Sequence, residues 1–464
     1  MQNNIIYKKI AIVGAGSMGT MMSQLFAEAD LDVSIFDVKG ENVDIAIELA
    51  RENPKVRGKI HGFKEYGPFV GSLGDEGGRL FLLSITHGWP ADNVLNEIGK
   101  YLKPGDIVLD GGNEFYLESG DPDALDKVMP LLETVAAKDG NGRPCVRKMG
   151  PDGAGHYVKM VHNGIEQGMM SALCEAWGLL RYNMDLEMDE IGQIFSQWDR
   201  KGELRDNFLC DIGADISCRR PASDKRKYVL DEVMDKVVQD DDDSEGTGIW
   251  TVMEAARNHI AAPTIASGHF FRVASGSRAE RLSVRRNLAL SPASGVTVED
   301  KAAFIEDLRL ALYATFLASY VQGMNLISRQ SHAAKWGTKL TDCLAVWRAG
   351  CIITSDDIID RLQPIAEAKE GDIANLLEDP SIGKEFLRTY GPLKRVVAKA
   401  VEWDAYAPSV SATLEWVKYC GGEVLPTQFM EAELDYFGAH QYDKWGEEPG
   451  KAMTGKHHYE WKPA

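Results

Sequence analysis

A glycine-rich turn between a strand and a helix, close to the start of the chain, constrains the fold most. Lys9–Val13 is a short, apolar, β-branched run typical of a buried strand, and Gly14-Ala-Gly-Ser-Met-Gly19 follows it directly. Met21–Ala29 then has a helical pattern, and Asp32–Asp37 is the next strand-like run. In this context GxGxxG predicts a dinucleotide-binding Rossmann unit, because the glycines let a pyrophosphate approach the helix N-terminus. The alternative is an ordinary glycine turn.

The predicted cofactor contacts are the residues of this turn and the acid that ends the second strand: Gly14, Ala15, Gly16, Ser17, Met18, Gly19 and Asp37. A carboxylate at the end of that strand accepts hydrogen bonds from the ribose 2′-hydroxyl and repels a 2′-phosphate. Asp37 therefore favours NAD over NADP. Lys39 could still meet a 2′-phosphate, so the sequence leaves NADP open.

Two further apolar runs, Arg79–Ser84 and Asp106–Asp110, predict buried strands of the same sheet. The second run ends in Asp110-Gly-Gly-Asn113, at the carboxyl edge where open α/β sheets bind ligands. We therefore expect Asn113 to lie at a ligand site, with a plain turn as the alternative.

The stretch Gly153–Gly168 carries the predicted chemistry. Its polar residues, Lys159, His162, Asn163 and Glu166, follow the spacing i, i+3, i+4 and i+7, which places them on one face of a helix. The residues between them are mostly apolar and suit burial. A lysine and a glutamate two turns apart on a buried face can divide the roles of base and acid. On spacing alone, a helix with a solvated polar stripe is the alternative.

The same stretch, Gly-Ala-Gly-His-Tyr-Val-Lys-Met-Val-His-Asn-Gly-Ile-Glu, closely resembles the signature of the 6-phosphogluconate dehydrogenase family. The resemblance implies that Lys159 is the general base, that Glu166 is the general acid, and that His162 and Asn163 bind substrate. It also implies that Asn113 contacts cofactor and substrate. The family's usual cofactor is NADP, although its Asn-Arg-Thr sequence is replaced here by Asp37-Val-Lys.

One segment of the family pattern is absent. Between Asp-Gly-Gly-Asn and the catalytic helix, the family carries another strand and the motif Gly-x-Ser-Gly-Gly-x-x-Gly-Ala, whose Ser and two Gly help to hold substrate. In this chain Glu114 to Gly150 is an acidic loop and one helix, Asp123–Ala137, with no Ser-Gly-Gly. A few dozen residues are missing, through a real deletion or a faulty gene model, and the sheet is predicted to expose an unpaired edge.

The family's grip on the substrate phosphate is also altered. Family members use a Tyr, a Lys, two Arg and a His for this purpose. Matched by motif, Arg272 and His440 are retained as substrate ligands, whereas the other positions are now Gln167, Glu245 and Leu434. The loss of two cations and the gain of a carboxylate weaken the binding of a dianion. The chain thus keeps the catalytic helix and loses much of the phosphate clamp.

After the Rossmann unit the periodicity is helical almost throughout. We predict an α/β Rossmann domain over residues 1–150, shortened after Asn113, a large all-α substrate and dimerisation domain over 151–440, and a tail over 441–464. In the family such a tail inserts into the partner subunit, which implies a homodimer. Two further stretches that resemble the family are interpreted mainly as helix caps and core packing: Gly246–Thr251 and Val346–Ile353.

The net charge of −19 argues against nucleic acid or an anionic membrane as the main partner. The seven cysteines form no metal-type or redox-type pairs, which predicts reduced thiols in a cytoplasmic protein. We see no secretory signal at the start of the chain and no uninterrupted apolar run long enough to cross a bilayer.

The resemblance implies NAD(P)-dependent oxidative decarboxylation of 6-phosphogluconate to ribulose 5-phosphate, without a metal, because the lysine and neighbouring donors can stabilise the developing enolate. Two alternatives stay open. The altered phosphate clamp is compatible with a dehydrogenase of a different hydroxy acid, including an unphosphorylated one. The missing Ser-Gly-Gly segment is compatible with a catalytically impaired binding or subunit paralogue.

Overall fold

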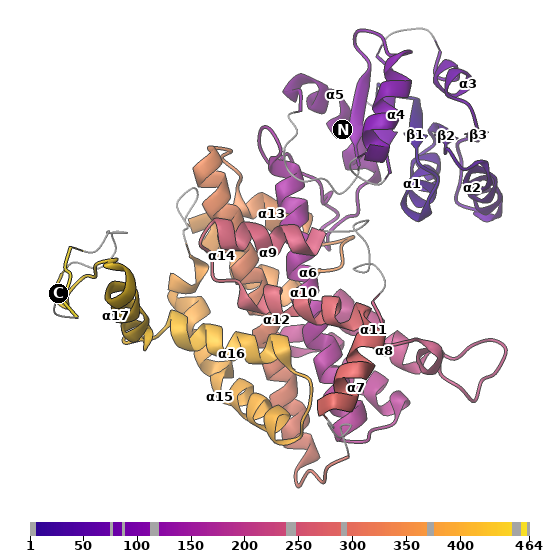
Figure 1. Ribbon diagram of the computed structural model, residues 1–464. Coiled ribbons are helices and arrows are strands. Elements are labelled where there is room, and N and C mark those ends of the chain that lie inside the picture. The colour runs from indigo at the N-terminus through magenta and orange to yellow at the C-terminus, as the bar shows by residue number, and fades with distance from the viewer. Residues whose placement is uncertain are drawn as a thin grey trace. The chain divides into compact units, whose positions relative to one another are not determined.

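The computed structural model describes residues 6–74, 78–85, 89–111, 120–237, 247–288, 295–368, 375–447 and 456–461. The chain divides into two compact units, Met1–Thr413 and Leu414–Ala464 (Figure 1). Two residues predicted from the sequence to be functionally important, Asn113 and Glu245, lie outside the described residues.

The first unit begins with a parallel sheet, as predicted. Among the described residues, five strands pair in the order β3-β2-β1-β4-β5. Their bounds are β1 Lys9–Val13, β2 Asp32–Phe36, β3 Ile60–Phe63, β4 Leu80–Leu83 and β5 Ile107–Asp110. The strand order reverses between β1 and β4, so the glycine turn after β1 lies at the topological switch point where such sheets bind ligands.

Helices cover the sheet on two faces, because successive side chains of a strand point in opposite directions. Ile10 and Ile12 of β1 pack into a cluster with residues of α1, α2 and α5, whereas Ala11 and Val13 pack into a second cluster with residues of α3 and α4. These helices are α1 Ser17–Glu28, α2 Gly40–Glu52, α3 Tyr66–Gly71, α4 Trp89–Gly99 and α5 Pro122–Val135. The predicted strands β1 and β4 are therefore buried on both sides, whereas β5 is only partly buried.

The sheet ends at β5, as the missing segment predicted. Within the described residues β5 pairs with β4 on one side and has no strand on the other. The next element is α5, which contributes Val128 and Leu131 to the core on one face of the sheet instead of extending the edge. The predicted unpaired edge is thus present in the described part of the chain.

The rest of the first unit is helical, which confirms the predicted fold class. Its helices are α6 Ala154–Gly178, α7 Met188–Arg200, α8 Phe208–Cys218, α9 Thr247–Arg257, α10 Pro263–Gly276, α11 Arg278–Leu288, α12 Lys301–Ala334, α13 Leu340–Val346, α14 Asp356–Ala368, α15 Pro380–Glu402 and the start of α16 Pro408–Cys420. Shorter helical turns cover Leu179–Asn183, Gly202–Leu204, Val229–Glu232 and Leu376–Glu378. The second unit contains α17 Thr427–Gly438.

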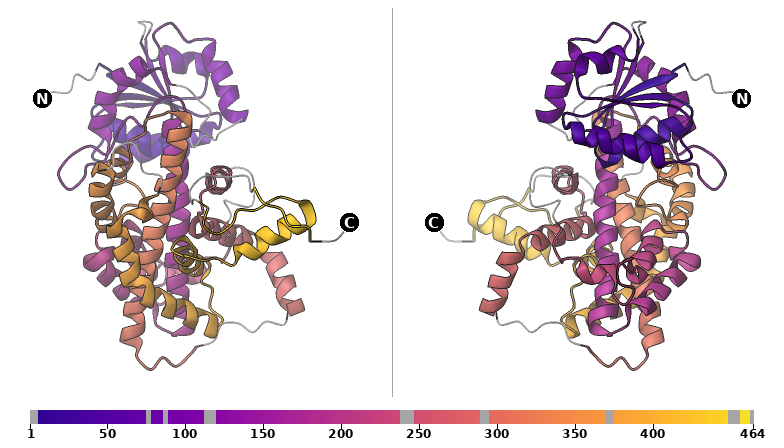
Figure 2. Two further views of the ribbon diagram at one scale, coloured as in Figure 1. Left: turned by 90° about the vertical axis from the view of Figure 1, so that its left-hand side faces the viewer. Right: turned by 90° about the vertical axis from the view of Figure 1, so that its right-hand side faces the viewer.

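The antiparallel helices α6 and α12 pack side by side at the centre of the helical region (Figure 2). Glycines allow this close approach. A Cβ atom added to Gly168 would lie 2.5 Å from Ser319 Oγ, and one added to Gly323 would lie 2.5 Å from the Ile165 side chain. By length and hydropathy alone α12 could cross a membrane, but 94% of its most apolar window is buried inside the protein, as in a core helix.

A buried ion pair joins β4 and β5 at their amino-terminal ends. The Arg79 guanidinium lies 2.6 Å from Asp106 Oδ2 and also donates to the carbonyl oxygen of Tyr101. The Asp106 carboxylate accepts backbone hydrogen bonds from Arg79 and Lys103 as well. Burial raises the pKa of Asp106, but these hydrogen bonds outweigh it and lower the pKa to about 2.

We predict that Asp106→Asn lowers the free energy of unfolding by about 3–5 kcal/mol at neutral pH, because it leaves the Arg79 cation buried and unpaired. Since the folded-state pKa of Asp106 lies below the unfolded value, its stabilisation is present above about pH 4 and is lost as the pH falls toward 2. Urea unfolding followed by circular dichroism measures both effects. Asp44→Asn, which breaks an exposed pair with Lys64, is the control and should cost less than about 1 kcal/mol. Equal losses in the two variants would contradict the prediction.

Candidate active site

The turn after β1 has the geometry of a dinucleotide-binding loop. Gly14 has a φ of +102°, and a Cβ there would lie 2.1 Å from the Ser84 carbonyl oxygen. A Cβ on Gly19 would lie 1.9 Å from the Gly14 carbonyl oxygen, whereas a Cβ on Gly16 would meet nothing within 4 Å. Thus the first and third glycines permit tight packing and the second leaves open space. Helix α1 follows with no acidic side chain in its first turn, so its amide groups suit a pyrophosphate.

Asp37 lies directly beside this turn. Its Oδ2 atom accepts a hydrogen bond of 2.8 Å from the Ala15 amide, and its Oδ1 atom accepts one of 2.8 Å from the Lys39 amide. The carboxylate is therefore fixed between the glycine turn and the start of α2, where the ribose of a dinucleotide binds in this fold.

The predicted catalytic helix is α6. Its apolar residues Tyr157, Val158, Met160, Val161 and Ile165 are buried, as predicted. Their burial leaves the polar residues on a separate face. There, the Lys159 ammonium donates to Asn163 Oδ1 at 3.1 Å, and His162 Nδ1 lies 3.0 Å from the same oxygen and 3.9 Å from Glu166 Oε2. The structure thus brings the predicted base, acid and substrate ligands of α6 together.

The surroundings of Lys159 and Glu166 move their pKa values toward each other. The Lys159 side chain keeps access to solvent, yet desolvation by nearby protein atoms lowers its pKa against the opposing charge of Glu166. Burial raises the pKa of Glu166, although the charges of Lys159 and Arg272 oppose this. A lysine with a lowered pKa can act as a base, and a glutamate with a raised pKa can act as an acid near neutral pH.

His162 is the most enclosed of these residues, with 4% of its surface exposed. Burial and the charge of Lys159 lower its pKa to about 4, so its ring is neutral at neutral pH. Its Nε2 atom is buried and has no hydrogen-bond partner in the part of the chain that the structure describes. In this structure His162 contacts Asn163 and is shielded from solvent.

Three neighbours of the α6 site were not assigned from the sequence. Thr247, the first residue of α9, accepts a 3.0 Å hydrogen bond from the Asn163 side chain. The Trp347 ring lies 6.3 Å from the His162 ring, and ionisation of the Cys351 thiol, whose pKa burial raises, would raise the pKa of Lys159. These residues belong to the two stretches that were interpreted mainly as caps and core packing. Their resemblance to the family was the available signal.

The described positions that match the family's phosphate ligands have different surroundings. Gln167 is buried, its Oε1 lies 3.1 Å from His269 Nδ1, and its amide packs against Gly248 at the start of α9. Arg272 of α10 is partly buried and lies close enough to Glu166 to influence its pKa. His440 and Leu434 belong to the second unit. Gln167 is therefore used in a contact between helices.

The carboxyl end of β5 also approaches α6. Asp110 Oδ2 lies 3.8 Å from Nε2 of His156, which is in the first turn of α6. This contact brings the start of the Asp-Gly-Gly-Asn motif close to the catalytic helix.

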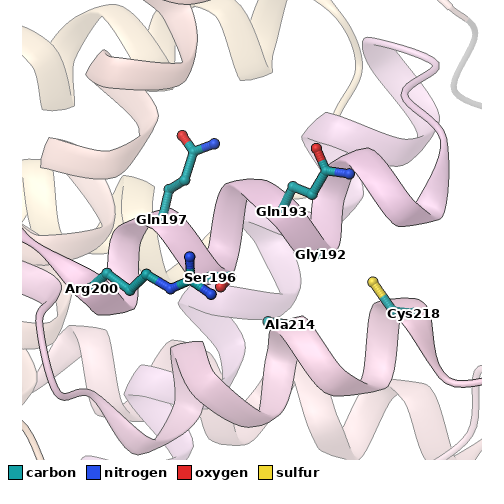
Figure 3. A pocket seen from close by; sticks show the side chains of 7 residues that line it. All are labelled: Gly192, Gln193, Ser196, Gln197, Arg200, Ala214 and Cys218. Atoms are coloured by element: carbon teal, nitrogen blue, oxygen red, sulfur yellow. The ribbon is translucent and has the colours of Figure 1, made fainter.

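A surface pocket of about 330 Å³ lies between α7 and α8 (Figure 3). Gln193, Gln197 and Arg200 of α7 and Cys218 of α8 are among its lining residues. None of the residues predicted to act in catalysis or cofactor binding lines it, so we do not assign it to the reaction.

Comparisons with known proteins identify the family of this chain. The family model described as the C-terminal domain of 6-phosphogluconate dehydrogenase matches residues 155–461, and the NAD binding domain of 6-phosphogluconate dehydrogenase matches residues 9–119. A decarboxylating 6-phosphogluconate dehydrogenase of Emericella nidulans is 47% identical, over 96% of this chain and all of that protein. The chain belongs to the 6-phosphogluconate dehydrogenase family.

Two further relatives extend this result. Decarboxylating 6-phosphogluconate dehydrogenase 1 of Spinacia oleracea is 32% identical, over 98% of this chain and 97% of that protein. The solved structure of the 6-phosphogluconate dehydrogenase of Plasmodium falciparum, described in apo form and in complex with NADP+ and with 6-phosphogluconate, superposes with a TM-score of 0.83. It is 26% identical, and the match covers 98% of this chain and all of that chain.

The alignments also contain positions that have no residue in this chain. The match to the Emericella nidulans protein extends over 497 positions, whereas 96% of this 464-residue chain is about 445 residues. About 50 aligned positions therefore have no residue in this chain. The two family models leave residues 120–154 unmatched, which is the region where the Ser-Gly-Gly motif was expected.

We predict that Lys159→Met lowers the rate of hydride transfer by about 10²–10⁴-fold, because it removes the general base. The dissociation constant of the dinucleotide should stay near the wild-type value, since Lys159 is on α6 and the glycine turn is after β1. Stopped-flow measurement of cofactor reduction and a fluorescence titration test the two statements. Lys201→Met, at an exposed lysine that follows α7, is the matched control. Unchanged turnover in Lys159→Met would refute the assignment.

We predict that Glu166→Gln shifts the acidic limb of the pH profile of cofactor reduction to lower pH. The charge of Glu166 raises the pKa of Lys159, so removing that charge lets Lys159 lose its proton at lower pH. The rate of the complete reaction should fall by about 10²–10⁴-fold, because the general acid is lost. A profile whose acidic limb stays in place or moves to higher pH would be incompatible with this pairing.

Proposed function

We propose that this protein catalyses NAD(P)-dependent oxidative decarboxylation of 6-phosphogluconate to ribulose 5-phosphate. The observation that carries the proposal is the polar face of α6, where a lysine with a lowered pKa and a glutamate with a raised pKa share one environment. The glycine turn after β1 provides the cofactor site, and the curated relatives carry the name of this enzyme. These relatives favour this function over the two alternatives.

The α6 residues fit each proton transfer of this reaction. Lys159 accepts the proton of the substrate 3-hydroxyl as the C3 hydride departs, and bound NAD(P) supplies the hydride acceptor. The resulting β-keto acid loses its carboxylate as CO₂, and the bond electrons form an enediol. Lys159 returns its proton to the C3 carbonyl oxygen as the enediol forms. Glu166 then protonates substrate C2, which becomes C1 of ribulose 5-phosphate, while Lys159 takes back the C3 hydroxyl proton to give the ketone. Asn163 holds the Lys159 ammonium in place through its 3.1 Å contact.

One observation favours the alternative of an unphosphorylated hydroxy acid. Gln167 stands at the position of the family's phosphate-binding Tyr. Its side chain forms a hydrogen bond with His269 and packs against Gly248. A buried amide in such a contact is a poor phosphate ligand. We therefore expect 6-phosphogluconate to be turned over with a high KM.

The function is tested by supplying 6-phosphogluconate or gluconate with NAD or NADP, and by measuring reduced cofactor, CO₂ and ribulose 5-phosphate. Stoichiometric formation of all three from 6-phosphogluconate supports the proposal. Turnover of gluconate alone would indicate an unphosphorylated substrate. Absence of turnover with dinucleotide binding intact would indicate a non-catalytic paralogue.

We further propose that NAD is preferred over NADP, because the fixed Asp37 carboxylate accepts from a ribose hydroxyl and repels a phosphate. We predict that Asp37→Asn shifts the ratio of the NADP and NAD dissociation constants toward NADP by about tenfold or more. Fluorescence titration with each dinucleotide measures this ratio. Glu41→Gln, at an exposed acid in the first turn of α2, makes the same charge change as a control. Tighter binding of NADP than NAD by the wild type would overturn the preference.

We propose that the protein is a cytoplasmic homodimer. The exposed apolar side chains Phe429, Met430 and Phe437 of α17 support a partner at this helix, and the free cysteines are compatible with a reducing compartment. Light scattering of the purified protein tests the dimer, and a monomer at micromolar concentration would contradict it.

A further inference from the structure

The second unit contains a buried carboxylate that neither catalysis nor cofactor binding uses. Asp435, on the last turn of α17, has 1% of its surface exposed. Its Oδ1 atom accepts hydrogen bonds from the Gln441 amide at 3.0 Å and from His458 Nδ1 at 2.9 Å. Its Oδ2 atom accepts them from the Tyr459 amide at 3.1 Å and from Trp461 Nε1 at 2.8 Å. A single carboxylate thus joins the end of α17 to residues 456–461 of the tail.

Asp435 also accepts hydrogen bonds from the residues on both sides of His440. The Ala439 amide donates to the Asp435 carbonyl oxygen at 2.9 Å, and the Gln441 amide donates to the Asp435 carboxylate. Ala439 and Gln441 have left-handed φ values of +49° and +66°. Non-glycine residues keep such conformations only where the surrounding structure holds them. Asp435 therefore fixes the backbone on each side of His440.

The exposed His440 ring lies directly over Gly438. A Cβ atom added to Gly438 would lie 2.4 Å from Cδ2 and 2.6 Å from Nε2 of His440. The ring also lies 6.0 Å from the Phe437 ring, in an edge-on arrangement. The imidazole is thus folded back over Gly438, in space that a larger residue would fill.

We propose that Asp435 and Gly438 are positioning residues for His440, and that the tail stabilises this arrangement through Asp435. The inference rests on the proposed function and on the family resemblance, which implies that His440 is a substrate ligand. Backbone pairing between Tyr442 and His457, with hydrogen bonds of 2.8 and 3.1 Å, holds the tail beside the same loop. The Trp461 ring, 6.0 Å from Tyr436, adds an aromatic contact. Because the Asp435 carboxylate binds both the tail and the Gln441 amide, binding of the tail also orients His440.

The main test replaces Asp435 with Asn, whose amide group cannot accept hydrogen bonds on its nitrogen side. Hydrogen–deuterium exchange should become faster in peptides that cover 439–442 and 457–461. The KM for 6-phosphogluconate should rise by roughly ten- to a hundredfold, with kcat changed much less, because a charge-assisted hydrogen bond behind a binding residue is lost. Asp443→Asn, at an exposed acid of the same loop, is the matched control and should change neither quantity.

A double-mutant cycle separates positioning from general destabilisation. If Asp435 acts through His440, the double variant Asp435→Asn/His440→Ala has the same KM as His440→Ala. A further rise in KM in the double variant would overturn the positioning role. Gly438→Ala should displace the imidazole and raise KM while exchange at 457–461 stays at the wild-type rate. A wild-type KM in Gly438→Ala would remove that residue from the proposal.

The outcomes also distinguish this inference from the proposed function. A raised KM in His440→Ala together with a wild-type KM in Asp435→Asn would overturn the positioning role and leave the function intact. An unchanged KM in His440→Ala would overturn the substrate role of His440 and the inference with it. If the wild type does not turn over 6-phosphogluconate, the function fails, and the exchange of peptide 439–442 still decides whether Asp435 holds the loop.

Discussion

Close packing of α6 against its neighbours is the constraint on which the rest of the site depends. Gly164 lies against Thr251 of α9, Gly168 lies against Ser319 of α12, and Gly268 of α10 lies against the Gln167 backbone. Side chains at these positions would push the helices apart. Because protein interiors are packed without spare volume, the buried face of α6 cannot rotate, and its polar face is held in one orientation. The partial desolvation that shifts the pKa values of Lys159 and Glu166 follows from this enclosure.

Much of the fold was predictable, because local patterns determine it. The apolar run Lys9–Val13, the glycine turn and the acid at Asp37 indicate a Rossmann unit by spacing alone, and β1 has the predicted bounds. The spacing of Lys159 and Glu166 on a helix was equally readable. Contacts between distant segments were not. The Asn163–Thr247 and Gln167–His269 hydrogen bonds join residues 84 and 102 positions apart, and no periodicity links them. The same holds for the tail residues that surround Asp435.

In the shortened Rossmann region, strand β5 is tied to β4 at one end, and its other edge is unpaired among the described residues. The Arg79–Asp106 pair fixes β5 to β4 at the amino-terminal end, while the other edge of β5 has no strand beside it among the described residues. Exposed edges of this kind invite pairing with other chains. The exposed edge of β5 is short, because the strand has only four residues and all of them are at least partly buried. By resemblance to the family, the segment expected after Asn113 would supply both a wall for the substrate and a strand beside this edge.

Under the proposed function, Asp37 performs two tasks with one carboxylate, and this has an evolutionary consequence. The carboxylate proposed to bind a ribose also anchors the glycine turn through the Ala15 amide. A substitution of Asp37 by a cationic residue would change the dinucleotide preference. The same substitution would also remove the hydrogen bond that holds the glycine turn. A gradual path would need an earlier substitution that holds Ala15 independently, so cofactor choice in this chain is protected by loop architecture as well as by charge.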